Sequence, residues 1–199
     1  MLMEDLKRTA ERLTGLARPS PKQARALVRT RKANAWRFRD DGLTPNHPAW
    51  PVLYYRGAVA LAGAFDPAAI FEVLFAARGW KHGWRDVIYD YLHYHSDQHE
   101  VLGIARGRAT LRLGGARGRT LNVKAGDVLV LPAGTGHQRL SKSKDLLVVG
   151  AYPGKGGYDM CRPTKVDHDR AAGAVLKTKR PHADPVYGIE GPLTRLWKT

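Results

Sequence analysis

Residues 87–100 read Val-Ile-Tyr-Asp-Tyr-Leu-His-Tyr-His-Ser-Asp-Gln-His-Glu, and this stretch decides the fold. The run from Val87 to His95 is rich in β-branched, leucine and aromatic residues, which predicts a β-strand. Because the side chains of a strand alternate between its two faces, the imidazoles of His93 and His95 should project from the same face. Their spacing therefore predicts a pair of histidines that can bind one ion together.

Two further spacings extend this pair. Glu100 follows after a polar turn, so the sequence reads His-x-His-x4-Glu-x6-Gly up to Gly107, where the next hairpin must reverse. A second run, from Gly126 to His137, reads Gly-x5-Pro-x-Gly-x2-His, which is a strand that ends in a Pro/Gly turn and presents a histidine. Four potential metal ligands thus lie in two separate elements.

At these residues the sequence resembles the cupin superfamily, whose two motifs carry three histidines and one glutamate that bind a metal inside a β-barrel. The flanking sequence, such as Ile88-Tyr-Asp-Tyr and Ala133-Gly-Thr-Gly-His, resembles the YjlB-like branch of cupins over about Trp36 to Trp197. Two positions depart from the usual motifs, with Val87 in place of a glycine and Ser141 in place of an asparagine. Neither position is a ligand in the family, so the metal hypothesis stands.

The resemblance implies a mainly β fold, the cupin double-stranded β-helix or jelly-roll β-barrel, with N-terminal helices and a C-terminal extension. It implies the metal ligands His93, His95, Glu100 and His137. His99 adjoins Glu100 and is the alternative ligand, but neighbouring strand residues face opposite ways. We favour Glu100 because it alone keeps the family's spacing to the glycine of the first motif.

Turn residues and amphipathic patterns divide the chain into three parts. Residues 1–40 hold eleven of the 33 basic residues against four acidic ones. They predict two helices, the second with Ser20 as N-cap and Pro21 at its first position. Residues 41–160 form the predicted barrel, with one inserted helix at about 67–78. Residues 161–199 are expected to pack on the barrel as a C-terminal extension.

Cysteine usage and hydropathy indicate the compartment. Cys161 is the single cysteine of the sequence, which predicts a reducing, cytoplasmic environment. The first residues mix acids and bases, and no run approaches the roughly 20 apolar residues of a membrane span. We therefore expect neither export nor insertion into a membrane.

The formal net charge of +15 would attract polyanions, so nucleic acid is a partner to be weighed. Four tryptophans could supply a stacking platform beside the basic helices. They are Trp36, Trp50, Trp80 and Trp84. Packing in the core explains them more simply, so nucleic-acid binding is the least favoured of the functions considered.

Three side chains near the predicted ligands are candidates for a substrate pocket. Tyr89 and Tyr91 share the parity of His93, so they should point into the barrel, where they would either bind substrate or fill the core. Arg139 shares the side of the strand on which His137 lies. It would either meet an anionic substrate or form a salt bridge at the rim.

Neutral imidazoles and one carboxylate suit one divalent ion of Fe, Mn, Co, Ni, Zn or Cu, and the absence of thiolate ligands argues against a structural zinc site. Four protein ligands on an octahedral ion would leave two positions for substrate or water. The sequence thus favours an enzyme acting on a small oxygen-containing molecule, of the dioxygenase, isomerase or decarboxylase type. A non-catalytic small-ligand-binding or sensor protein is the alternative. Edge strands that need cover predict a homodimer.

Overall fold

The computed structural model of the chain describes residues 18–154 and 157–198. The first of the two predicted N-terminal helices falls within residues 1–17, outside the described residues. The second is confirmed as α2 (Pro21–Ala26), with a capping box at its start. The backbone N–H of Gln23 donates to the Ser20 hydroxyl at 3.3 Å, and the Ser20 N–H donates to the Gln23 side chain at 2.8 Å.

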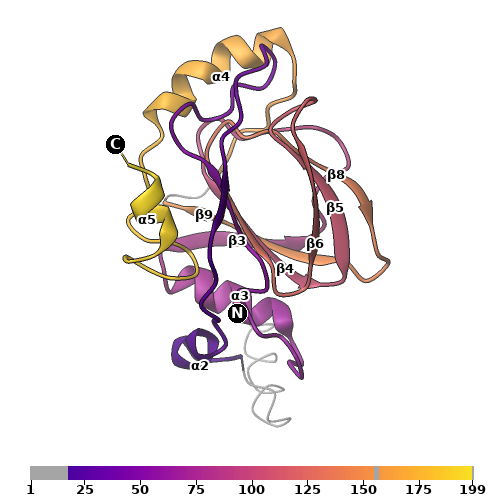
Figure 1. Cartoon of the computed structure of the whole chain (residues 1–199), viewed down its shortest axis with the longest axis vertical. Coiled ribbons are helices and arrows are strands. Elements are labelled where there is room, and N and C mark those ends of the chain that lie inside the picture. The colour runs from indigo at the N-terminus through magenta and orange to yellow at the C-terminus, as the bar shows by residue number, and fades with distance from the viewer. Residues whose placement is uncertain (1–17, 155–156, 199) are drawn as a thin grey trace, which may run out of the picture.

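The mainly β prediction is confirmed, because two antiparallel sheets face each other as a jelly roll (Figure 1). One sheet has six strands in the order β1-β2-β7-β4-β9-β3, and the other has three in the order β6-β5-β8. The strands are β1 (Asn34–Trp36), β2 (Val52–Tyr55), β3 (Trp80–Asp86), β4 (Glu100–Arg106), β5 (Arg108–Leu113), β6 (Arg119–Lys124), β7 (Val128–Leu131), β8 (His137–Lys142) and β9 (Leu147–Pro153).

The four central strands of the six-stranded sheet are buried on both faces, which explains why they are apolar without alternation. In β7, Leu129 and Leu131 point inward and pack with Leu111 of the smaller sheet. Val128 and Val130 point the other way, into a second cluster on the outer face of the sheet. This alternation also fixes where polar side chains on the same strands point.

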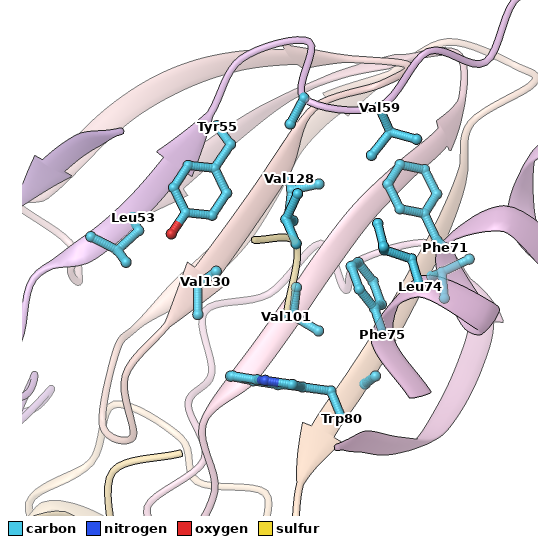
Figure 2. Packing of buried hydrophobic residues seen from close by; sticks show 14 of the residues in the cluster. Leu53, Tyr55, Val59, Phe71, Leu74, Phe75, Trp80, Val101, Val128 and Val130 are labelled. Atoms are coloured by element: carbon cyan, nitrogen blue, oxygen red, sulfur yellow. The ribbon is translucent and has the colours of Figure 1, made fainter. Parts of the chain in front are cut away.

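Helix α3 (Pro67–Ala76) covers the outer face of the large sheet and falls within the range predicted for the inserted helix. Asp66 caps it by accepting hydrogen bonds from two backbone N–H groups at its start. Phe71 and Phe75 project from the helix toward Val101 of β4 (Figure 2). A Cβ at Gly103 would lie 2.6 Å from the Phe71 ring, so this close approach of helix and strand requires glycine.

The C-terminal residues pack on the jelly roll at two places. Helix α4 (Lys165–Lys177) buries Ala171 in a small cluster with Tyr94 and Cys161, whereas α5 (Pro192–Leu196) adds Leu193 to the outer-face cluster of the large sheet. Trp197 is fully buried, donates from Nε1 to the Pro51 carbonyl at 2.8 Å and stacks on Trp50. Asp184 accepts a 2.5 Å hydrogen bond from the Tyr55 hydroxyl. Within residues 18–154 and 157–198, no helix has the length and hydrophobicity that crossing a membrane requires.

The prediction of a strand from Val87 to His95 is wrong. The strand before it, β3, ends at Asp86, and residues 87–99 form an irregular segment between β3 and β4. Single bridges join His93 to His137 and Tyr94 to Cys161. Successive residues of the segment therefore bond to different partners, so no continuous ladder forms.

Candidate metal centre

His93, His95 and His137 form a buried cluster in which one nitrogen from each ring lies within 4.8 Å of the others. The backbone holds two of them together, because the His93 N–H donates to the His137 carbonyl at 3.2 Å and the His137 N–H donates back at 2.9 Å. The ring centroids of this pair are 4.1 Å apart. The structure thus brings the two sequence elements to one place.

Each imidazole of the cluster is oriented by a backbone carbonyl. The Nδ1 atoms of His93, His95 and His137 lie 3.1, 2.6 and 3.0 Å from carbonyl oxygens of Tyr91, Asp159 and Thr135 respectively. A carbonyl oxygen only accepts hydrogen bonds, so each Nδ1 carries the proton and donates. In the neutral ring, Nε2 then keeps a free lone pair, which is the state that a metal ligand requires.

Glu100 lies beside this cluster at the start of β4. It shares the inward parity of Leu102 and Ile104, which places its carboxylate inside the barrel. Its Oε2 lies 3.2 Å from Nε2 of His137 and 3.8 Å from Nε2 of His95. The four side chains predicted as ligands therefore converge.

The second carboxylate oxygen of Glu100 is bound by Tyr152, whose hydroxyl donates to Oε1 at 2.8 Å. Trp84 donates in turn from Nε1 to the Tyr152 hydroxyl at 2.9 Å. Oε2 is buried and accepts no hydrogen bond from any residue that the structure describes. A buried carboxylate oxygen without a donor is costly, so this atom fits a site for a cation.

The ionisation states suit metal binding as well. Burial, and next the charge of His137, lower the pKa of His93 to about 3, which keeps its imidazole neutral. Burial opposes ionisation of Glu100, but His137, His95 and Tyr152 outweigh it and lower the pKa of this carboxyl to about 2. An anionic oxygen of Glu100 thus lies 3.2 Å from Nε2 of His137, a contact that a proton or a metal ion between the two atoms would stabilise.

His99, the alternative ligand considered above, has both ring nitrogens engaged elsewhere. Its Nδ1 accepts from the Ala133 N–H at 2.9 Å, and its Nε2 lies 3.2 Å from the Lys179 carbonyl. The residue is fully buried and packs against both Trp50 and Trp197. His99 therefore ties the barrel to the C-terminal segment and lies outside the histidine cluster.

A cavity of about 240 Å³ opens onto the cluster and Glu100. Most of its remaining wall is aromatic or aliphatic. The wall residues are Trp84, Arg85, Asp86, Val87, Ile88, Tyr89, Leu102, Tyr152, Tyr158 and Met160. The space suits a small molecule that could reach an ion held by the four side chains.

Of the three predicted pocket residues, the structure places Tyr89 in the wall of the cavity. Tyr91 stacks on Tyr89 and lies under the Arg162 guanidinium, away from the lining. Arg139 also lies outside the lining, because its Nε donates to the Ile88 carbonyl at 2.9 Å and its Nη2 lies 3.6 Å from Asp90. It is held at the rim.

The loop that carries Asp159 is part of the site and gave no sequence signal. Its carbonyl accepts from His95, while its carboxylate accepts from the Ser96 N–H at 2.7 Å and the Ser96 hydroxyl at 2.6 Å. The Cys161 thiol donates to the same carboxylate at 3.1 Å. These contacts fix residues 159–161 against residues 95–96, two segments that are far apart in sequence.

No protein-family model matches the chain. Among curated proteins, the uncharacterized protein YjlB of Bacillus subtilis (strain 168) is 36% identical over 167 residues, which cover 84% of this chain and 98% of YjlB.

Solved structures with a similar fold are more distant. The QdtA 3,4-ketoisomerase of Thermoanaerobacterium thermosaccharolyticum has a TM-score of 0.39 at 17% identity, over 47% of this chain and 74% of that one. The oxalate decarboxylase OxdC of Bacillus subtilis has a TM-score of 0.32 at 19% identity, over 56% of this chain and 23% of that one. Such values carry no information on substrate or reaction.

The match with YjlB covers 98% of that protein and 84% of this chain. The chain belongs to the YjlB-like cupins.

Proposed function

We propose that the protein binds one divalent transition metal through Nε2 of its three clustered histidines and the carboxylate of Glu100, and acts on a small neutral oxygen-containing molecule. The observation that carries the proposal is the shared orientation of His93, His95 and His137. Three separate backbone carbonyls fix the same tautomer in all three rings. Histidines that only fill a core do not need that agreement.

The donor set restricts the ion. Three imidazoles and one carboxylate suit Fe, Mn, Co, Ni, Zn or Cu in the divalent state, and the buried Cys161 lies outside the cluster. Such an ion supplies Lewis acidity at bound oxygen atoms, and iron, manganese or copper can also supply redox chemistry.

The residues around the site have distinct tasks in this proposal. Tyr152 holds Oε1 of Glu100 and leaves Oε2 directed at the histidines. Burial, and next the negative charge of Glu100, raise the pKa of Tyr152, so its hydroxyl stays protonated and remains a donor. The aromatic wall excludes bulk water from the cluster, which strengthens every electrostatic contact inside it.

The charges in the wall favour a neutral substrate. Among the described residues, Arg85 is the one lysine or arginine of the lining, and its guanidinium is bound by Asp66 at 2.8 Å and by Glu72 at 2.5 Å. Asp86 adds a negative charge to the same wall. An anionic substrate would therefore find no unpaired lysine or arginine among the described side chains of the lining, whereas an uncharged molecule would pack on the aromatic rings.

A non-catalytic ligand-binding function is the second candidate, and one observation favours it. Apart from Glu100 and the histidines, the carboxylate and guanidinium groups among the described lining residues are those of Arg85, which is paired, and Asp86. A general acid or base at the substrate is thus less evident than the binding surface. Turnover of an added compound decides between the two functions.

The first test is elemental analysis of protein purified without a metal-affinity tag. We expect close to one equivalent of a transition metal in the wild type and a large loss in His93→Ala and His137→Ala. His182→Ala is the matched control, because His182 is exposed and lies outside the cluster. Metal that persists undiminished in both cluster variants would refute the ligand assignment.

A further inference from the structure

A second concave surface lies where β4 ends, and it is strongly basic. This groove of about 1000 Å³ is lined by three groups of residues: Arg29, Arg31 and Lys32; Arg56, Gly57, Val59, Ala60, Leu61, Ala62, Ala64, Phe65 and Pro67; and Ala105, Arg106, Gly107, Lys124 and Ala125. We name it the basic groove, after its six cationic side chains. They are Arg29, Arg31, Lys32, Arg56, Arg106 and Lys124. Its lining contains no aspartate or glutamate among the described residues.

Hydrogen bonds between the loops make the floor of the basic groove rigid. The Arg29 N–H donates to the Ala58 carbonyl at 2.8 Å, and the Ala125 N–H donates to the Gly107 carbonyl at 3.0 Å. Asp127 is buried beneath the floor and accepts from the backbone of Gly57 at 2.7 Å and of Lys124 at 2.9 Å. The cations are therefore presented on a fixed base, which limits the entropy lost on binding.

The six cations are exposed, and none forms an ion pair with a carboxylate in residues 18–154 and 157–198. Arg31 makes a 3.4 Å contact from Nε to the carbonyl of Gly57, which leaves its charge uncompensated. The carboxylate of Asp127 is occupied by backbone donors and by the Tyr54 hydroxyl. Like charges brought together on one surface repel one another, and a polyanion relieves that repulsion.

An exposed aromatic ring lies in the same wall. Phe65 is 77% exposed and directly precedes Asp66, the N-cap of α3. The floor around it is built from small residues such as Gly57, Ala62 and Gly107, which let a bound backbone approach closely. An isolated exposed phenylalanine needs no explanation, but one beside six unpaired cations is the combination that single-stranded nucleic acids bind.

We propose that the basic groove binds a single-stranded nucleic acid, with phosphates on the cations and one base stacked on Phe65. A duplex is a convex rod with its bases inside, so it would leave Phe65 without a partner. An acidic peptide would match the charge but offers no planar ring for the phenylalanine. The combination of charge and ring thus favours the single strand.

The basic groove is separate from the metal centre. Glu100 begins β4 and Arg106 ends it, so about 20 Å of strand lies between the two sites at roughly 3.3 Å per residue. The basic groove therefore shares no lining residue with the cavity at the proposed metal site. Either function could fail in an experiment without affecting the other.

The test is fluorescence anisotropy of the full-length protein with a labelled single-stranded oligonucleotide of about 12 nucleotides at low salt. We expect the logarithm of the affinity to fall with the logarithm of salt concentration, by about 0.7 for each phosphate neutralised. The double variant Arg56→Glu/Arg106→Glu should lose affinity about tenfold or more. Phe65→Ala should lose about fivefold for the oligonucleotide and nothing for inorganic polyphosphate.

Arg117→Glu/Lys177→Glu is the matched control, because it removes the same net charge from exposed residues outside the basic groove. An equal loss in both double variants would mean attraction by net charge alone and would overturn the proposal. Absence of binding by the wild type would overturn it as well. Equal affinity for a poly-glutamate peptide, with no effect of Phe65→Ala, would identify an acidic protein partner instead. Circular dichroism confirms that each variant is folded.

Discussion

The Tyr152 hydroxyl donates to Oε1 of Glu100 at 2.8 Å, while Oε2 of the same carboxylate lies 3.2 Å from Nε2 of His137. One carboxylate thus has one oxygen held by the protein and one directed at the histidine cluster. This division of roles makes Tyr152 a positioning residue for the proposed ligand.

Removing that hydroxyl should weaken metal binding without unfolding the protein. We expect Tyr152→Phe to lower the affinity for the metal by about 10- to 100-fold, the usual effect of losing a group that orients a ligand. Competition with a chromophoric chelator measures the affinity. Tyr187→Phe, which removes a hydroxyl bound to the Arg29 carbonyl, should leave it unchanged. Equal metal affinities in wild type and Tyr152→Phe would show that the Tyr152 hydroxyl is not needed to orient the carboxylate of Glu100.

The loop that carries Asp159 should contribute to metal affinity about as much as Tyr152 does. Asp159→Ala removes the acceptor for two hydrogen bonds from Ser96, so the loop no longer holds its carbonyl against His95. We expect about tenfold weaker metal binding together with a lower melting temperature. Asp159→Asn retains one acceptor oxygen, so its metal affinity should lie between those of the wild type and Asp159→Ala. Thermal unfolding with and without added metal separates the effect on the fold from that on the site.

A glycine pair offers a sharp test of packing. A Cβ at Gly150 would lie 2.1 Å from the Trp84 ring, whereas a Cβ at Gly173 in α4 would meet nothing within 4 Å. We expect Gly150→Ala to lower the free energy of unfolding by about 1–3 kcal/mol, since the tryptophan must move. Gly173→Ala should raise it by about 0.5–1 kcal/mol, as expected for alanine in a helix. Urea unfolding of the two variants measures both effects. Opposite signs would show that the loss in Gly150→Ala comes from the contact with Trp84 and not from replacing a glycine as such.

Stability should also depend on pH through the contact between His168 of α4 and Asp40. His168 Nε2 lies 2.9 Å from both oxygens of Asp40, and this hydrogen bond raises the pKa of the histidine. A raised pKa in the folded state means stabilisation that is complete below the unfolded value of about 6.5. It disappears as the pH rises through the folded value.

We expect Asp40→Asn to destabilise the protein by about 0.2–1 kcal/mol at pH 6 and by less at pH 9. The free energy of unfolding at the two pH values, for wild type and variant, gives this difference. A loss that is the same at both values would mean that the charge of His168 plays no part.

The sequence predicted the fold and the place of the site because those depend on spacing. His93 and His95 adjoin one polar turn, and His137 follows a Pro/Gly turn, so turn geometry brings them together. The alternation of side chains along a strand predicted correctly that His93 and His95 lie together, but a regular strand is not what directs their rings. The two histidines belong to an irregular segment, and their rings are directed by carbonyls and not by a regular strand.

Other features lay beyond the sequence for physical reasons. The edge strand β3 is interrupted by a register shift between Lys81 and Trp84 and contains the positive φ of His82, so it lacks the alternation that marks a strand. His95 is oriented by the backbone carbonyl of Asp159, a group that every residue possesses, and the loop around Asp159 has no sequence motif, so nothing in the sequence indicates this contact. Tyr152 could have been found, because it shares the inward parity of Val148 on β9.

The two buried faces of the large sheet limit how the cavity could be re-engineered. Leu102 of β4 faces the cavity, and the next residue of the same strand, Gly103, faces the opposite way and lies against Phe71. The strand therefore cannot shift outward to make room for a larger molecule. Room can be gained only at the mouth, where Tyr89 and Tyr158 are partly exposed. Laboratory evolution toward bulkier compounds should therefore accumulate its substitutions in these loops and leave the sheet untouched.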